Sequence, residues 1–294
     1  YPHPYARTTR EAAARVTGFE PGWILVGNGS DDLLTMLMRS VAEPGRKVVF
    51  PSPTYVLYQT LAEIQDAEVV EVSFDEEYRL PVADLAKAAG AVTLVANPNS
   101  PSGTCASNEE LAELAGSLDG LLVIDEAYVD FADATALPLV REHENVLVLR
   151  TLSKGYSLAG LRLGFAIGRP VVIGGLSKVK DSYNVDALSC LAGAAALDDQ
   201  DWKNAHAEKI RASRERLSEN LRALGFRVWP SQSNFLLARP SDGAANALYE
   251  GLKRRGILVR YFDRPRLSDK LRITVGTDEQ NAALIAALKE IATG

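Results

Sequence analysis

One lysine of this chain lies in a sequence context that favours covalent chemistry. Lys154 belongs to the stretch "TLSKGYSLAGLRLGF" (151–165), directly after a serine and shortly after the apolar run 146–149. Arg162 follows eight residues later, before another apolar segment. A partly desolvated lysine amine can form a Schiff base with a carbonyl group and can also move protons. This position at a strand end therefore favours a catalytic lysine over a solubilising one.

An acidic residue and two tyrosines also follow apolar or loop-forming segments. Asp125 ends the apolar part of "VIDEAYVDF" (123–131), where a carboxylate is costly to bury without a positive partner. An ordinary acid at a turn is a credible interpretation for Glu126 and a weaker one for Asp125. Tyr128 lies three residues beyond Asp125. Tyr55, in "PSPTYVLY", follows two prolines, and its ring could stack on a planar ligand or simply be half-buried.

The stretch "GNGSDDLLTMLMRSV" (27–41) has the features of an anion site. Ser30 is expected to cap a helix, because acidic residues and then apolar residues at helical spacing follow it. The glycines just before it would let the backbone turn and point free N–H groups at a phosphate-sized anion. Taken alone, the stretch is better explained by a capped helix without a ligand. It lacks the third glycine of a dinucleotide-binding motif, and the sequence contains no G-x-x-x-x-G-K-[ST] motif.

The order of apolar and amphipathic segments predicts the fold. Short β-branched runs alternate with helical patterns, which is typical of an α/β fold with a mostly parallel central sheet covered by helices. Two long helical patterns, at about 178–198 and 203–224, then lead to a smaller α+β unit. We expect a large domain over residues 1–200 and a small domain over residues 201–294, joined by a continuous helix. Strands of the large domain are expected at 47–50, 67–74, 91–96, 121–125, 145–150 and 161–168.

Composition excludes several classes of protein. The 294 residues are 47% hydrophobic and 24% charged, as in ordinary globular proteins, and contain no apolar run long enough for a membrane helix. The net charge of −6 argues against nucleic acid as a partner. Cys105 and Cys190 fit neither a metal-binding spacing nor a disulfide framework, so we expect no metal site and a cytoplasmic location.

The motifs converge, because ligands of open α/β sheets bind outside the carboxyl ends of the strands. A lysine, an acid, aromatic rings and phosphate donors at one site suit pyridoxal 5'-phosphate (PLP). The chain resembles the fold type I PLP-dependent aminotransferases of class II and, within them, the histidinol-phosphate aminotransferase family. The stretches that carry the resemblance follow the family's order over nearly the whole chain: "GNGSDD", "PSPTY", "NPNSPSGT", "DEAYVDF", "RTLSKGYSLAGLRLGF" and "LRITVGT".

The resemblance implies a role for each matching residue around the cofactor. Lys154 would carry PLP as a Schiff base, Asp125 would pair with the pyridine nitrogen, and Tyr128 would bind the ring hydroxyl. Tyr55 would stack on the ring. The cofactor phosphate would be held by Ser153, Arg162 and the backbone at Gly29, Ser30 and Asp31, with Thr151 nearby.

The resemblance also implies substrates and a partner. Arg272 of "LRITVG" would clamp the substrate's α-carboxylate, and Arg260 of "ILVR" would reach its distal group. The substrates would be histidinol phosphate or imidazole acetol phosphate, with glutamate and 2-oxoglutarate, as in histidine biosynthesis. Tyr1 matches a family tyrosine that reaches the phosphate of the neighbouring subunit, which predicts a homodimer with Tyr1 in the partner's site.

The chain departs from the family pattern in two places. The family loop usually reads N-P-x-N-P-T-G with its second asparagine on the ring hydroxyl, and Ser100 stands at that position here. Asn97 is expected to substitute, with Asn99 as the alternative. The family's N-terminal arm, which covers the substrate, would lie before Tyr1. An aromatic amino acid aminotransferase, a threonine-phosphate decarboxylase, and an inactive or regulatory PLP-binding protein remain alternatives.

Overall fold

The central element of the fold is a seven-stranded sheet. The computed structural model describes residues 1–293, with the side chains of residues 1–291. The strands are β1 (Ile24–Gly27), β2 (Lys47–Ser52), β3 (Glu68–Ser73), β4 (Val92–Ala96), β5 (Leu121–Asp125), β6 (Val146–Thr151) and β7 (Gly164–Gly168). Their order is β1-β7-β6-β5-β4-β2-β3, and only β7 runs antiparallel to its neighbours. The prediction of an α/β fold with a mostly parallel central sheet is confirmed.

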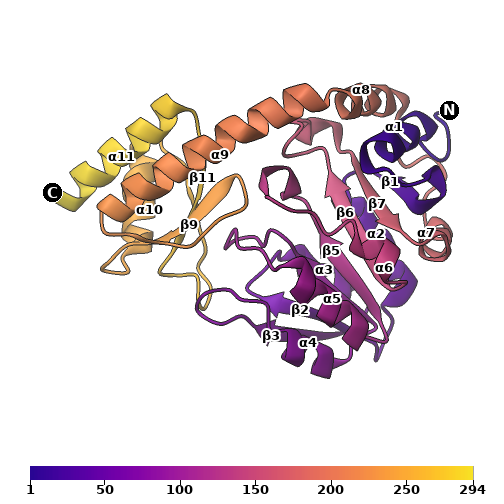
Figure 1. Cartoon of the computed structure of the whole chain (residues 1–294). Helices are drawn as coiled ribbons and strands as arrows, with labels where there is room; N and C mark the ends of the chain where they lie inside the picture. The colour runs from indigo at the N-terminus through magenta and orange to yellow at the C-terminus, as the bar shows by residue number, and fades with distance from the viewer. Residues whose placement is uncertain (294) are drawn as a thin grey trace.

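Helices cover both faces of this sheet (Figure 1). Along β5, Leu122 and Ile124 pack into one core while Val123 packs into the other, so the strand is apolar on both sides. This explains why the predicted strands are continuous apolar runs rather than alternating ones. One face carries α1 (Arg7–Thr17), α4 (Val82–Ala88), α5 (Asn108–Ser117), α6 (Leu139–Glu142) and α8 (Ala187–Asp198), and the other carries α2 (Ser30–Val41), α3 (Leu57–Ile64) and α7 (Pro170–Ser177).

A second, antiparallel sheet follows in the chain. Its order is β10-β11-β9-β8, formed by β8 (Arg227–Val228), β9 (Phe235–Arg239), β10 (Arg260–Tyr261) and β11 (Leu271–Thr274). A single long helix, α9 (Gln200–Ala223), runs from α8 to this sheet, as Figure 1 shows in orange. The helices α10 (Ala245–Arg254) and α11 (Asp278–Thr293) pack on it around a separate apolar core. None of the helices in the described residues is long and apolar enough to cross a membrane.

Three local expectations from the sequence were wrong. Strand β1 was not predicted, because its four residues are too short to stand out as a pattern. The helix expected at 178–198 begins only at Ala187, since the Asp186 carboxylate accepts the backbone N–H of Ser189 and caps the helix there. Ser30 is the first helical residue rather than the cap. Gly29 holds the cap position with φ of 85°, a conformation that glycine adopts without a steric penalty.

Basic side chains of α9 connect the two sheets. Arg214 is only 5% exposed and donates to the carbonyl oxygens of Phe131, 3.3 Å away, and Ser233, 3.0 Å away. Phe131 ends the short 3-10 helix η2 (Val129–Phe131), which follows β5, whereas Ser233 precedes β9. Arg211 donates in the same way to the carbonyl of Ala132 at 2.8 Å. The end of β5 and the start of β9 are therefore held by the same helix.

Replacing Arg214 with methionine should lower the free energy of unfolding by about 2 kcal/mol, because buried carbonyls would lose a charged donor. The matched control is Arg216→Met on the same helix. Arg216 pairs with the exposed Asp278, and surface ion pairs contribute about 0–1 kcal/mol. Urea unfolding of both variants measures the difference. Equal losses in the two variants would show that Arg214 has no special part in joining the sheets.

Candidate active site

Lys154 lies in the loop after β6 and is half-buried. Its Nζ atom lies 5.4 Å from the centre of the Tyr128 ring. Burial and then the positive charge of Arg272 lower the pKa of Lys154. A lysine with a lowered pKa is more often deprotonated near neutral pH, and the neutral amine is the nucleophile. The structure therefore places the lysine in surroundings that suit Schiff-base chemistry.

Asp125 ends β5 and is 4% exposed. Its Oδ2 accepts a hydrogen bond from the Tyr58 hydroxyl at 2.8 Å, and its Oδ1 accepts the backbone N–H of Ala127 at 3.1 Å. Burial raises the pKa of Asp125 to about 6 in spite of both donors. Among the described residues, no cation forms an ion pair with it. A positively charged ligand atom at this position would supply the missing partner.

Tyr58 is a site residue that the sequence analysis missed. Its side chain is fully buried in α3, and burial raises its pKa well above the usual value. The phenol therefore stays protonated and donates to Asp125. Its ring also meets the Tyr55 ring edge-on, with 5.7 Å between the ring centres. The available signal was the spacing of three residues between Tyr58 and Tyr55, which lies two residues before the start of α3.

The start of α2 and Arg162, which faces it, form the candidate anion site, the anion cradle. Arg162 lies across this loop, and its Nη2 donates to the Asp31 carboxylate at 3.0 Å. A Cβ atom on Gly29 would lie only 2.8 Å from that guanidinium, so a larger residue would displace Arg162. Tyr55 donates to the other oxygen of Asp31 at 3.2 Å. Free N–H groups at a helix start beside an arginine suit a phosphate group.

Two hydroxyl groups lie beside this cradle at the end of β6. The Oγ1 of Thr151 is 2.9 Å from the Oγ of Ser153 and also accepts the backbone N–H of Ser153 at 3.1 Å. Thr151 is buried, and Ser153 is partly exposed to the same cavity. The pair therefore adds oriented hydroxyl groups next to Lys154.

The second sheet contributes two arginines. Arg260 and Arg272 are directly opposite each other in β10 and β11, and like charges in such pairs normally destabilise a sheet. The Nη1 of Arg272 donates to the hydroxyl of Ser100 at 2.9 Å, while its Nε is buried without a partner. Burial, followed by the charge of Arg260, lowers the pKa of Arg272. An anion bound here would offset both the repulsion and the unpaired donor.

Most of these groups line one cavity of about 280 Å³ between the two sheets, whereas Tyr58 and Arg260 do not. Its size suits a small planar cofactor together with part of a substrate. The buried acid without a cation, the lysine with a lowered pKa and the anion cradle fit PLP. The residues that line it are Ser30, Asp31, Tyr55, Ala96, Pro98, Ser100, Asp125, Ala127, Tyr128, Thr151, Ser153, Lys154, Ala159, Arg162 and Arg272.

Four expected residues, Gly29 among them, do not line this cavity. The Asn97 amide accepts the backbone N–H of Ala106 at 2.8 Å and donates to its carbonyl at 3.2 Å, so the Asn97 side chain is bound to its own loop. Ser100 lines the cavity instead. Arg260 is exposed, and its guanidinium lies 5.2 Å from the centre of the Phe262 ring. Tyr1 is fully exposed and stacks on Tyr183, with 5.0 Å between the ring centres.

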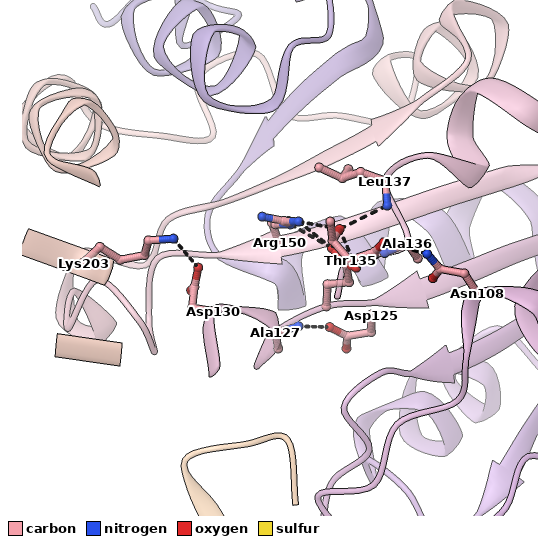
Figure 2. A network of polar contacts seen from close by, with 10 residues as sticks. Asn108, Asp125, Ala127, Asp130, Thr135, Ala136, Leu137, Arg150 and Lys203 are labelled. Carbon is pink, nitrogen blue, oxygen red and sulfur yellow. Dashed lines mark hydrogen bonds and ion pairs between the residues drawn. The ribbon is translucent and has the colours of Figure 1, made fainter. Parts of the chain in front are cut away.

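Glu126 lies between β5 and a turn, where an acid is a credible structural residue, but it is 2% exposed and belongs to a buried polar network. Its carboxylate pairs with Arg150 at 2.8 Å and accepts from the Thr135 hydroxyl at 2.9 Å and the Ala136 N–H at 2.6 Å. Figure 2 shows Arg150, Thr135 and Ala136 clustered beside Asp125. Because Arg150 belongs to β6, the network ties the end of β5 to the strand that leads to the lysine.

Comparison with known proteins agrees with this geometry. The model of the family "Aminotransferase class I and II" matches residues 1–288. The chain belongs to this family. It is 56% identical to histidinol-phosphate aminotransferase 1 of Trichormus variabilis, over 99% of this chain and 83% of that protein. It is 45% identical to histidinol-phosphate aminotransferase of Citrifermentans bemidjiense, over 100% of this chain and 84% of that protein.

A solved structure shares the fold over the whole chain. The histidinol-phosphate aminotransferase from Sinorhizobium meliloti, in complex with pyridoxal-5'-phosphate, has a TM-score of 0.93 and 30% identity, covering 100% of this chain and 83% of that one. The resemblance to histidinol-phosphate aminotransferases and the prediction of an aminotransferase fold are therefore confirmed.

The raised pKa of Asp125 predicts how the stability of the cofactor-free protein depends on pH. An unfolded aspartate has a pKa of about 3.9, whereas burial raises the pKa of Asp125 to about 6. The folded state thus binds this proton more tightly, and the stability that results is lost as the pH rises through about 6. Asp125→Asn removes this titration. The free energy of unfolding of the variant minus that of wild type should therefore increase by about 2–3 kcal/mol as the pH rises from 4 to 7. Urea unfolding at both pH values measures this, and a constant difference would contradict it.

Proposed function

We propose that this PLP-dependent aminotransferase transfers the amino group of histidinol phosphate to 2-oxoglutarate, giving imidazole acetol phosphate and glutamate, as a step of histidine biosynthesis. The observation that carries this proposal is that one cavity is lined both by Lys154, whose pKa is lowered by burial, and by Arg272, which has an unpaired buried N–H. A substrate with an amino group and an anionic end suits that pair. The choice of histidinol phosphate rests on the names of the relatives that share this chain's sequence.

The residues around the cavity support a role for each of them in binding the cofactor. When bound, PLP supplies an electron sink for the electrons released at the substrate's α-carbon. Asp125 would hold a proton on the pyridine nitrogen, and Tyr58 keeps the Asp125 carboxylate in place through its 2.8 Å hydrogen bond. The backbone N–H groups at the start of α2 and the guanidinium of Arg162 would hold the phosphate. Tyr55 would lie against the ring, and Tyr128 would bind its hydroxyl.

Lys154 would act as the proton carrier of the reaction. Its Nζ atom would take the proton from the substrate's α-carbon and return a proton to the cofactor side of the site, as a general base and acid. A pKa lowered by burial and by Arg272 makes that amine easier to deprotonate near neutral pH. The half-buried position of Lys154 also limits access of bulk water to the reacting atoms.

The two arginines of the second sheet would recognise the anionic ends of the substrates. A guanidinium matches the oxygens of phosphate and carboxylate alike, so Arg272 would serve both histidinol phosphate and glutamate. Arg260 lies opposite Arg272 in the sheet and would add a second positive charge for the distal group. Arg272 would therefore serve both halves of the reaction, with Arg260 adding positive charge from the neighbouring strand.

We further propose a homodimer in the cytoplasm. Tyr1 and Tyr183 form an exposed stacked pair beside the large sheet, and Tyr1 would reach the phosphate of the partner's cofactor. An exposed aromatic pair of this kind is stabilised when a second subunit covers it. Both cysteines are free thiols, as expected in a reducing compartment.

Lys154→Ala should abolish turnover, because no other group in the cavity combines an amine with a lowered pKa. Reduction of the wild-type holoenzyme with borohydride, followed by peptide mass spectrometry, should place the cofactor on Lys154. Lys178→Ala is the control and should keep both turnover and the reduced adduct. A reduced adduct on any other lysine would show that the site is assigned incorrectly.

The substrate is tested by comparing amino donors on the purified protein. Histidinol phosphate should be used at least tenfold more efficiently, in kcat/KM, than phenylalanine or tyrosine with 2-oxoglutarate as acceptor, since both arginines favour a doubly charged anionic end. Release of glutamate is the readout. Faster turnover of the aromatic amino acids would favour an aromatic amino acid aminotransferase. Release of carbon dioxide from threonine phosphate would favour a decarboxylase.

A further inference from the structure

The hydroxyl of Ser100 contacts an arginine across the cavity. It accepts a hydrogen bond from Nη1 of Arg272 at 2.9 Å. A serine hydroxyl has one proton to give and lone pairs that accept. Because a guanidinium can only donate, Ser100 is the acceptor in this bond and keeps its own proton for another partner.

This contact determines which edge of Arg272 is available to a ligand. A guanidinium can hold an anion through Nη1 and Nη2 or through Nε and Nη2. One N–H of Nη1 is already occupied by Ser100, and Nε is buried without a partner. The rings of Phe235 and Phe262 lie 5.0 Å and 5.7 Å from the guanidinium carbon, so aromatic contacts restrict the group further. The remaining N–H groups of Nη1 and Nη2 are therefore the ones left for an anion in the cavity.

Ser100 itself is well placed to hold the arginine. It is 9% exposed and belongs to the loop after β4, whereas Arg272 comes from β11 of the other sheet. The serine backbone is therefore anchored independently of the strand that carries the arginine. Arg260 opposite would otherwise push the guanidinium away, because the two charges are alike.

We propose that Ser100 is a specificity-determining residue for the anionic end of the substrate. By engaging one N–H of Nη1, its hydroxyl orients Arg272 so that the remaining N–H groups of Nη1 and Nη2 receive a phosphate or a carboxylate. The proposal rests on the proposed aminotransferase function and identifies which contact makes this site prefer charged over neutral substrates.

Anion binding can be measured without turnover. Maleate, an unreactive dicarboxylate, is titrated calorimetrically into the holoenzyme of wild type, Ser100→Ala and Ser100→Thr. The alanine variant should bind maleate about tenfold more weakly, as expected for losing one hydrogen bond to a charged group. The threonine variant keeps a hydroxyl and should recover most of the affinity. Ser117→Ala, at an exposed position of α5, is the matched control and should bind as wild type does.

Comparing two substrates distinguishes a change in substrate specificity from a general loss of activity. Histidinol and histidinol phosphate differ only in the phosphate, so single-turnover rates at low concentration compare a neutral and an anionic donor. Ser100→Ala should lower the rate with histidinol phosphate about tenfold more than it lowers the rate with histidinol. Equal losses with both donors, or unchanged maleate affinity, would overturn the role of Ser100. If wild type binds maleate but does not use histidinol phosphate, the proposed function fails while the anion site stands.

Discussion

The burial of one carboxylate, Asp125, is the constraint on which the rest of the site depends. An acid at the end of a strand that is apolar on both faces can be ionised only if donors and a positive charge compensate for the loss of water. The chain supplies the donors, from Tyr58 and the backbone of Ala127, but none of the described residues supplies the charge. The site therefore lacks a positive charge next to Asp125, and a protonated ring nitrogen would supply it.

The neighbouring strands keep this carboxylate and the lysine in a fixed relation. Asp125 and Leu149 are paired across the parallel strands β5 and β6, and Lys154 follows five residues after Leu149. The buried pair of Glu126 and Arg150 adds a second tie between the same two strands. Parallel pairing brings strand ends to one edge, and buried ion pairs with full hydrogen bonding resist displacement. Precise placement of the reacting groups thus follows from strand pairing rather than from the loops.

Anion recognition depends on groups that reach the cavity from different sheets. Arg272 arrives from β11, its partner Ser100 from the loop after β4, and Arg162 from the segment before β7. Arg214 on α9 holds the end of β5 and the start of β9 to the same helix. The position of Arg272 relative to Lys154 therefore depends on how α9 joins the two sheets. A change in that junction would move the substrate's anion relative to the reacting amine.

The sequence by itself determined the mostly parallel sheet and pointed to Lys154, Asp125 and Arg162, because apolar runs and the residues that end them are local signals. It could not locate Tyr58, the burial of Glu126 or the pairing of Ser100 with Arg272. Those depend on contacts between residues 24 to 172 positions apart, which no local pattern encodes. Asn97 was misplaced for the same reason, since only the folded loop shows its amide bound to Ala106. The sequence indicated which residues could take part in chemistry, whereas tertiary packing decided which polar groups contact each other.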